Sequence, residues 1–452
     1  MARRLKADAK RILRAALDAV CPEACVLGAV RRNGARLLVG ETAFDLQSAR
    51  RVLVLGIGKA AVRMASGLET ILGSRIDGGL VLTVDGYGRR LRYIDVEEGG
   101  HPLPDNRGFE ASRRLAALAD DAGAGDLVVA VVSGGGSALL ALPDGDLTLE
   151  DLASTDALLL TSGMAIGEMN AVRKHVSALR GGRLAVRIHP ARLIVLVLSD
   201  VPGDPLPVIA SGPMVPDPST FAEAVTVLCR FDLWKDLSSR VQAHFSRGER
   251  GTVPETPKPG DPRFEGVVHR VVGSGRTAAL AALEAGEQLG YQGLLLTTTL
   301  QGEAREVGKV LAGLGRELAS FGRPIPTPAL VVAAGETTVT VRGRGMGGRN
   351  QELALAAAVG IAEMEHVVIA SLGTDGRDGP TAAAGGIVDG GTVGALRRRG
   401  IDPLQALEDN DSHTALRAVD ALLQTGPTGT NVADLVVVLA GPSRTAAARG
   451  PS

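Results

Sequence analysis

The sequence predicts an α/β protein with two layered domains, largely parallel sheets and an active-site cleft between the domains. Short apolar runs rich in valine, leucine and isoleucine recur along the chain, and glycine-rich loops and helix-like stretches follow most of them. The runs do not alternate between apolar and polar residues, which indicates strands buried on both faces, as in parallel sheets covered by helices. The runs and their loops lie at 51–61, 126–140, 191–204, 269–286, 329–338, 366–379 and 434–441. In such folds ligands bind beyond the carboxyl ends of the strands, where these loops lie.

The length of 452 residues indicates more than one domain. Residues 246–264 are rich in proline, glycine and charge and lack periodicity, so we expect a linker there. It separates a Rossmann-like N-terminal domain, residues 1–245, from a C-terminal α/β domain, residues 265–452. The stretch 3–20 has apolar residues on one helical face and predicts an amphipathic helix docked on the first domain.

Composition excludes several classes of protein. A formal net charge of −1 argues against a nucleic-acid binder, which needs a basic surplus. Three cysteines, Cys21, Cys25 and Cys229, give no disulfide framework or zinc pattern, which fits a reducing compartment, and we expect a cytoplasmic protein. No stretch reaches the roughly 18 unbroken apolar residues of a membrane helix, so we expect no membrane association.

Two glycine-rich loops in the N-terminal half are candidate anion sites. The string GIGKAA, with Gly56, Gly58 and Lys59, fits the G-x-G-x-x-A variant of the dinucleotide fingerprint, and Lys59 at a helix start suits a phosphoryl group or a carboxylate. The string SGGGS lets backbone N–H groups converge on an anion, and its serines can bind phosphate. Its residues are Ser133, Gly134, Gly135, Gly136 and Ser137. Both loops can also be ordinary turns, with Lys59 solvated and Ser137 capping a helix.

Two pairs of aspartates follow predicted strands. Asp200 and Asp204 flank a Pro-Gly turn, and Asp375 and Asp378 lie in GTDGRDG. Carboxylates on such loops can hold Mg²⁺ or accept a proton. The structural alternative is that they stabilise Asx turns.

Two further groups of polar residues are candidate binding residues. In GGRNQE, Arg349 can clamp a carboxylate or phosphate, or lie solvated on the surface. We include its neighbours and the acid after the strand at 329–335 among the binding candidates: Glu336, Asn350, Gln351 and Glu352. A dense polar group at 170–175 is either a binding surface or a solvated helix face, and its members are Asn170, Arg173, Lys174 and His175.

Taken together, these strings resemble the glycerate 2-kinases whose C-terminal half carries a MOFRL domain. The strings occur in family order from about residue 50 to 440, and the MOFRL-like region covers about 328–441. They are GIGKAA, GHPLPDNRG, VSGGGSALL, NAVRKHVSALRGGRLA, LSDVPGDPLPVIASGP, GMGGRNQEL, SLGTDGRDGPTAAAGGIVD, NDS and TGPTGTNVADL.

The resemblance implies transfer of the ATP γ-phosphoryl group to the 2-hydroxyl of D-glycerate, with Mg²⁺ as cofactor. It also implies that Lys59 and Arg349 are central to catalysis. From the paired loops themselves, and not from the resemblance, we take Asp200 and Asp375 as further catalytic candidates and Asp200, Asp204, Asp375 and Asp378 as candidate metal ligands. The chain departs from the family pattern, most clearly at Ala382, where an aspartate is common. We expect a small-molecule kinase acting on glycerate and a nucleotide, with a homodimer possible.

Two alternative functions stay open. Some proteins of this family are labelled hydroxypyruvate reductases, and an NAD(P)H-dependent reductase would use the GIGKAA loop with His101 or His175 as proton donor. A non-catalytic small-molecule sensor explains neither the paired aspartates nor Lys59 and Arg349. The chain has no Walker A motif, protein-kinase signature, H-E-x-x-H or G-x-S-x-G string.

Overall fold

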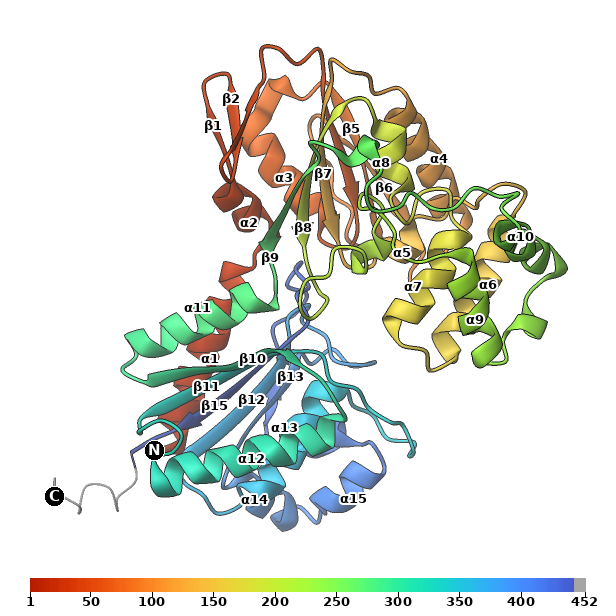
Figure 1. Ribbon diagram of the computed structural model, residues 1–452. Helices are drawn as coiled ribbons and strands as arrows, with labels where there is room; N and C mark the ends of the chain where they lie inside the picture. The colour runs from red at the N-terminus through yellow and green to blue at the C-terminus, as the bar shows by residue number, and fades with distance from the viewer. Residues whose placement is uncertain (443–452) are drawn as a thin grey trace. The chain divides into compact units, whose positions relative to one another are not determined.

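The computed structural model describes residues 1–442, which form two compact units (Figure 1). The parallel-sheet unit comprises Pro22–Ser199 and Asp204–Val272, and the mixed-sheet unit comprises Met1–Cys21, Asp200–Gly203 and the residues from Gly273 onward. Each unit has its own six-stranded sheet. Within residues 1–442, none of the helices has both the length and the apolar character that crossing a membrane requires.

The sheet of the parallel-sheet unit has the order β6-β5-β4-β7-β8-β9, and every pair from β6 to β8 is parallel. Numbered along the chain, this is the order 3-2-1-4-5-6 of the dinucleotide-binding folds. Helices α2 and α3 cover one face and α4 and α8 the other, so β4 and β7 are buried throughout (Figure 1). The bounds are β4 Val52–Ile57, β5 Gly78–Val84, β6 Asp95–Gly99, β7 Leu127–Ser133, β8 Arg192–Leu198, β9 Val268–Gly273, α2 Pro22–Ala29, α3 Ala61–Leu72, α4 Asn106–Asp120 and α8 Arg183–Ile188.

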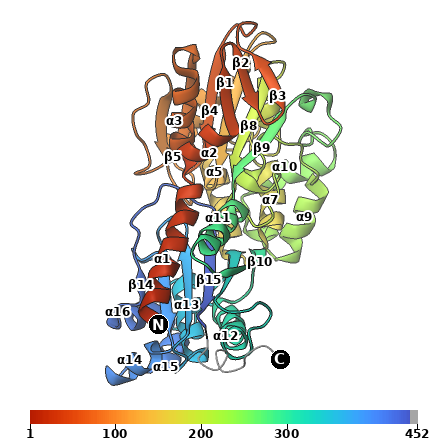
Figure 2. The ribbon, with the colours of Figure 1, turned by 90° about the vertical axis from the view of Figure 1, so that its left-hand side faces the viewer.

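Two additions complete this unit. An antiparallel three-stranded sheet stands beside α3 (Figure 2). A helical lobe of α6, α7, α9 and α10 packs around Phe221 and Phe245, two of the few aromatic residues in the chain. The bounds are β1 Val30–Asn33, β2 Arg36–Val39, β3 Thr42–Asp45, α5 Gly136–Leu139, α6 Leu149–Thr161, α7 Ile166–His175, α9 Phe221–Arg230, α10 Ser239–Glu249, and the 3-10 helices η1 Gly73–Arg75, η2 Ile209–Ser211, η3 Trp234–Asp236 and η4 Pro262–Phe264.

The sheet of the mixed-sheet unit has the order β10-β11-β15-β12-β13-β14, and only β10 and β11 pair in parallel. The prediction of largely parallel sheets is therefore wrong for this unit. Strands β11, β12 and β15 are buried throughout, and burial on both faces removes the alternation whatever the strand direction. The bounds are β10 Gln292–Leu300, β11 Ala329–Gly335, β12 Val367–Gly373, β13 Gly385–Asp389, β14 Leu422–Leu423 and β15 Asp434–Ala440.

Helices α1 and α11 pack on one face of this sheet and α12 and α13 on the other (Figure 1). The prediction that the first helix docks on the N-terminal domain is wrong, because the Tyr291 hydroxyl donates to Asp8 at 2.8 Å and Lys6 pairs with Asp389 at 2.8 Å. An amphipathic pattern identifies the buried face of a helix but not the surface that covers it. The bounds are α1 Ala2–Ala19, α11 Gly275–Gln288, α12 Ala304–Phe321, α13 Arg349–Gly360, α14 Thr392–Arg398, α15 Pro403–Glu408 and α16 Ser412–Ala418.

Residues 246–264 do not divide the two units, in contrast to the sequence prediction. Glu255 in this segment accepts hydrogen bonds from the backbone N–H of Phe221 and from His175, and Thr256 donates to Asp217. The segment therefore packs on the helical lobe, and the chain passes from one unit to the other at residues 21–22, at both ends of 200–203, and at 272–273. Composition predicts the absence of regular structure but not the absence of tertiary contacts.

Candidate active site

The two predicted glycine loops meet at the point where the strand order of the parallel sheet reverses. β4 and β7 are neighbours there, and Lys59 N–H donates to the Gly134 carbonyl at 2.9 Å, while Ala60 N–H donates to the Ser133 hydroxyl at 3.0 Å. Gly58 has φ 119°, and a Cβ at that position would lie 2.4 Å from the Ser133 carbonyl oxygen. Gly58 is therefore required for the contact, and the buried Ser133 links the two loops from inside the protein.

Lys59 and His101 lie against the second loop. A Cβ on Gly135, which has φ 83°, would be 3.2 Å from Lys59 Cγ and 3.4 Å from the His101 ring. Desolvation, together with the positive charges of Lys59 and Arg173, lowers the pKa of His101 to about 4. His101 is nevertheless exposed, so a neutral imidazole and two cations are grouped around an accessible glycine loop. This grouping is suited to a phosphate or a carboxylate.

The predicted polar group at 170–175 lies on α7 and is buried, so neither a broad binding surface nor a solvated helix face describes it. Lys174 pairs with Asp217 at 2.9 Å, and His175 contacts Glu255 at 3.0 Å and the edge of Phe221. These two side chains are occupied inside the helical lobe, which leaves the predicted binding role of Lys174 and His175 without structural support.

Arg173 lies at the border between this buried network and the glycine loop. Its Nε donates to Asp156 at 2.8 Å, and Arg180, which is fully buried, shares the same carboxylate at 3.2 Å. The charge of Arg173 acts on His101, so it lies within electrostatic reach of the loop. Asp156 thus positions Arg173, and Arg180 belongs to the same support.

A chain of three polar side chains ends at Ser137. Its hydroxyl lies 2.8 Å from that of Ser211, Ser211 donates to the Asn170 carbonyl oxygen at 2.9 Å, and Asn170 Nδ2 donates to the Val208 carbonyl at 3.2 Å. Ser137 does not cap α5, whose N-cap is Gly135 without a side-chain hydrogen bond. Ser211 was not among the sequence candidates, although it lies in one of the strings that resemble the family.

Within the mixed-sheet unit, a separate group of predicted site residues surrounds Arg349, the first residue of α13. Its guanidinium is forked by Asp434, with Nε to Oδ2 at 2.5 Å and Nη2 to Oδ1 at 3.0 Å, and Nη1 contacts Glu336 at 2.8 Å. Arg349 is therefore neither solvated nor a free clamp. Three of its five donors are directed to two carboxylates, and the others remain for a ligand.

Sequence reasoning missed Asp434 because it assumed parallel strands. Asp434 is the first residue of β15, and in a parallel sheet it would lie at the edge opposite to the strand ends. Because β15 runs antiparallel between β11 and β12, Asp434 is instead paired with Gly335 and Gly373, the last residues of those strands. The signal in the sequence was an acidic residue directly before an otherwise apolar run, and the structure shows that this residue is buried.

The four aspartates that were predicted as metal ligands separate into different roles. Asp378 is buried and accepts hydrogen bonds from the N–H groups of Asn350 and Gln351 at 3.1 and 2.8 Å, so it caps α13 and is not available to a metal. Asp204 adopts a left-handed conformation with φ 55° in the parallel-sheet unit, whereas Asp200 belongs to the mixed-sheet unit.

Asp200 and Asp375 lie within electrostatic reach of Glu336, which contacts Arg349. Desolvation raises the pKa of Glu336, Arg349 opposes this shift, and the negative charges of Asp434, Asp200 and Asp375 add to it. Asp200 accepts from Asn431 at 3.2 Å, and Asp375 accepts from the Arg377 N–H at 3.0 Å, as in an Asx turn. Over residues 1–442, no three His, Cys, Asp or Glu side chains are arranged to hold a metal ion by themselves.

The remaining predicted binding residues support α13 from within. Asn350, Gln351 and Glu352 are buried, and they contact Ser371, Asp378 and Arg305 respectively. Gln351 also contacts His413 at 2.8 Å. These side chains fix the start of the helix and hence the place of Arg349, and they do not point to solvent.

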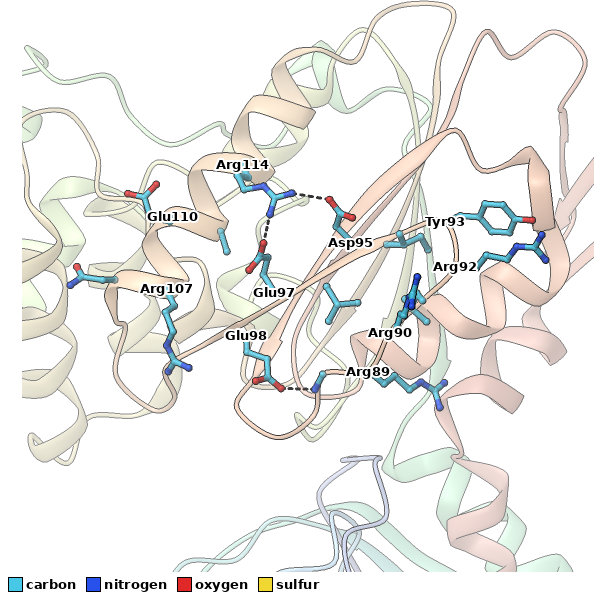
Figure 3. Close-up of a pocket in the computed structure, with 16 residues that line it drawn as sticks. Arg89, Arg90, Arg92, Tyr93, Asp95, Glu97, Glu98, Arg107, Glu110 and Arg114 are labelled. Atoms are coloured by element: carbon cyan, nitrogen blue, oxygen red, sulfur yellow. Dashed lines mark hydrogen bonds and ion pairs between the residues drawn. The ribbon is translucent and has the colours of Figure 1, made fainter.

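An open hollow of about 1210 Å³ in the parallel-sheet unit is lined by none of the candidate catalytic, binding or metal residues (Figure 3). It lies along the edge strand β6 and α4, beside an arginine-rich loop at 88–93. Its charges are largely neutralised in place, since Arg114 pairs with Asp95 and Glu97, and Arg107 pairs with Asp85. Size alone does not make this hollow the candidate site.

Comparison with known proteins identifies the family of the chain. The family model described as a domain of unknown function, DUF4147, matches residues 8–246, and the MOFRL family model matches residues 329–434. The chain is 42% identical to a glycerate 2-kinase of Pyrococcus horikoshii over 95% of this chain and 96% of that protein. It is 39% identical to a putative hydroxypyruvate reductase of Agrobacterium vitis, covering 86% of this chain and 87% of that protein.

Among solved structures, the crystal structure of a glycerate kinase from Thermotoga maritima superposes with a TM-score of 0.85 at 40% identity. The match covers 97% of this chain and all of that chain, so both units are shared. The loops at Lys59 and Ser137, the arginine at the start of α13 and the two family models together show that this chain belongs to the glycerate 2-kinase family with a MOFRL domain.

Proposed function

We propose that the chain transfers the γ-phosphoryl group of ATP to the 2-hydroxyl of D-glycerate, giving 2-phosphoglycerate and ADP. The observation that carries the proposal is the division of charge between two sets of loop residues. Lys59 and Arg173 lie at a glycine loop, whereas Arg349 lies among carboxylates. Phosphoryl transfer depends mostly on positioning and on stabilising charge, and both sets are suited to it.

The anionic groups of the substrates fit the glycine loops. In the proposal, Lys59 and the N–H groups at Gly134–Gly136 neutralise the phosphoryl oxygens, and Arg173 and the free donors of Arg349 orient the other anionic groups. Because the pKa of His101 is lowered to about 4, its imidazole is neutral at pH 7 and does not add a positive charge that would repel Lys59 and Arg173. Lys59, Arg349, Asp200 and Asp375 are the residues to which we assign catalysis.

The carboxylates beside Arg349 fit Mg²⁺ in company with a nucleotide. Mg²⁺ commonly takes one or two protein carboxylates and completes its shell with waters and substrate phosphates, so a complete protein cage is not required. In the proposal Asp200 and Asp375 would hold the ion, which would supply positive charge to the phosphate groups of the nucleotide. Glu336, which has the raised pKa, is suited to receive the proton of the 2-hydroxyl.

One observation favours a second candidate, the NAD(P)H-dependent reduction of hydroxypyruvate. Asp85 directly follows β5, the position from which dinucleotide-binding folds contact the ribose. Here, however, Arg107 forks Asp85 at 2.5 and 2.8 Å, which occupies both carboxylate oxygens. The reductase would therefore have to break an ion pair in order to bind its cofactor.

Product analysis separates the two functions. Purified enzyme with D-glycerate and Mg-ATP is expected to form ADP and a phosphate ester on carbon 2, identified by ³¹P NMR. ADP formation is expected to require both glycerate and Mg²⁺, and to stop when either is omitted. Oxidation of NADH or NADPH by hydroxypyruvate without ADP formation would establish the reductase instead.

Two further expectations belong to the proposal. The three cysteines form no disulfide in the described part of the chain, which fits a reducing compartment, and we propose a cytoplasmic location. We also propose a homodimer, which light scattering coupled to size-exclusion chromatography tests directly against the 46.5 kDa monomer mass.

A further inference from the structure

The direction of each hydrogen bond in the Ser137–Ser211–Asn170 chain follows from its inner end. The Val208 carbonyl can only accept, so the group of Asn170 that contacts it must be the amide nitrogen, at 3.2 Å. This fixes the orientation of the side-chain amide. The amide oxygen of Asn170 is therefore the atom that faces Ser211.

Ser211 has a single hydroxyl proton, and it donates this proton in the hydrogen bond to the Asn170 amide oxygen. If Ser211 donated to Ser137 instead, two acceptors would face each other at 2.9 Å without a proton between them. Ser137 must consequently donate its own proton to Ser211 across 2.8 Å. The Ser137 oxygen then keeps its lone pairs for a ligand and has no proton to give.

The packing holds this order in place. Asn170 and Ser211 are buried, with exposures of 2% and 0%. Ala210, Ser211 and Gly212 follow one another with φ of 51°, 59° and 56°, and a Cβ on Gly136 would lie 2.7 Å from the Ala210 Cβ. Ser211 therefore has little freedom to turn away. Ser137, in contrast, is half-buried, so its oxygen is accessible.

A fixed acceptor repels a phosphate oxygen, which is also an acceptor, and attracts an O–H group. We infer that Ser137 accepts a hydrogen bond from a hydroxyl group of the substrate that does not react, the 3-hydroxyl of glycerate, and so selects hydroxy acids with a second hydroxyl. The reacting 2-hydroxyl does not suit this place, because the chain ends at an amide and a carbonyl that take up no proton. The inference rests on the proposed kinase function and replaces the phosphate-binding role predicted for Ser137.

Substrate analogues test the inference on the unaltered enzyme. D-Lactate lacks the 3-hydroxyl, and the matching enantiomer of 3-fluoro-2-hydroxypropanoate replaces it with an atom of similar size that cannot donate. Both are expected to have kcat/KM values about tenfold or more below that of D-glycerate, the loss typical of an unmade hydrogen bond to a substrate hydroxyl. If the fluorinated acid is used as well as glycerate, Ser137 does not act as an acceptor and the inference fails.

The variant Ser137→Ala tests the residue itself. Its kcat/KM for glycerate is expected to fall about tenfold, while that for lactate stays within about twofold of wild type, so the preference disappears. An equal loss for both acids overturns the inference, as does a change in the KM for ATP or in the Mg²⁺ requirement, because either would place phosphate or metal at Ser137.

Two serine variants serve as comparisons. Ser133→Ala removes the other, buried hydroxyl of the same loop, and any loss should be common to glycerate and lactate. Ser211→Gly keeps the left-handed backbone but frees the Ser137 proton, so the preference for glycerate should weaken. It also leaves the buried Asn170 amide oxygen without this donor, so a thermal melt beside the kinetics checks that the variant is folded. Unchanged selectivity in Ser211→Gly would contradict the positioning role of Ser211. If the wild type forms no ADP from any of the acids, the proposed function fails and this inference fails with it, whereas an active kinase without the selectivity change refutes the inference alone.

Discussion

The two groups of site residues hold their cations in opposite ways. In the parallel-sheet unit, Lys59 lies against a glycine loop and makes no ion pair within residues 1–442. In the mixed-sheet unit, Arg349 is forked by Asp434 and contacts Glu336. A lysine without an ion-pair partner can change position with the transferred phosphoryl group, whereas a guanidinium bound by both oxygens of Asp434 keeps one position. The comparison suggests that Lys59 contributes charge and Arg349 contributes orientation.

The largest effects are expected from removing either cation. Lys59→Ala and Arg349→Ala should each lower kcat by about 10²–10³-fold, as for a preorganised group that stabilises developing charge. Thermal melting should change little for Lys59→Ala. Steady-state kinetics beside thermal melts measures both, and retention of more than about a third of wild-type kcat/KM by either variant would contradict its assignment.

The double variant and the conservative exchanges sharpen the comparison. If both cations act in one reaction, the losses in the double variant should be less than multiplicative. Lys59→Arg should keep part of the activity because only charge is needed. Arg349→Lys should recover less, because a point charge cannot form the fork with Asp434. If Lys59→Arg and Arg349→Lys retain the same fraction of wild-type kcat, the difference between the unpaired Lys59 and the paired Arg349 does not affect catalysis.

The next effect concerns the residue that holds Arg349. Asp434→Asn removes one charge of a largely buried pair, and kcat is expected to fall about tenfold or more while the KM for glycerate changes less, since Arg349 remains but is misplaced. A control at Asp126, whose carboxylate is also buried against two arginines but lies at the opposite end of β7 from the SGGGS loop, should affect melting and not kcat. A rise in KM alone in Asp434→Asn would instead indicate direct substrate contact.

Smaller effects should separate the aspartates. Asp200→Asn and Asp375→Asn are expected to raise the Mg²⁺ concentration needed for half-maximal activity by several-fold, because each removes one of a few ligands. Asp378→Ala should leave that concentration unchanged but destabilise the protein by about 1 kcal/mol, the typical cost of a lost helix cap. Magnesium titrations and thermal melts on the three variants give the comparison, and identical magnesium curves for all would remove the metal role.

The smallest effect is a shift in the titration of His101. Its pKa of about 4 lies below the ordinary value, so protonation of His101 is unfavourable in the folded state, and the stability this group contributes is lost as pH falls from about 6.5 towards 4. In Lys59→Met the pKa of His101 should rise, because one nearby positive charge is gone. NMR titration of the imidazole resonances, assigned with His101→Gln, tests this, and an unchanged pKa would mean that Lys59 lies away from the ring.

Local sequence signals predicted what depends on local structure. Gly58, Lys59 and the SGGGS string were identified because a strand, a tight glycine turn and a helix start lie within ten residues, and the structure places them in contact. Arg349 was found for the same reason. The arrangement of the aspartates was not predictable in this way, since the capping role of Asp378 depends on a helix that begins 29 residues earlier in the chain.

Strand direction and burial were the other limits. Apolar runs reveal that a strand is covered on both faces but not which way it runs, and Asp434 was missed for that reason. A polar string is taken as exposed when its partners are unknown. Lys174 and His175 were therefore predicted as binding residues, whereas in the structure Asp217 and Glu255 are their partners inside the helical lobe.

The placement of β15 has a consequence for biosynthesis. The strand at 434–440 lies in the middle of its sheet, and α1, which precedes it by more than 400 residues, packs against it. The central strand of the mixed-sheet unit is therefore made long after α1, whereas the parallel-sheet unit is complete by residue 272. Arg349 acquires its anchor, Asp434, only when this last described strand is inserted.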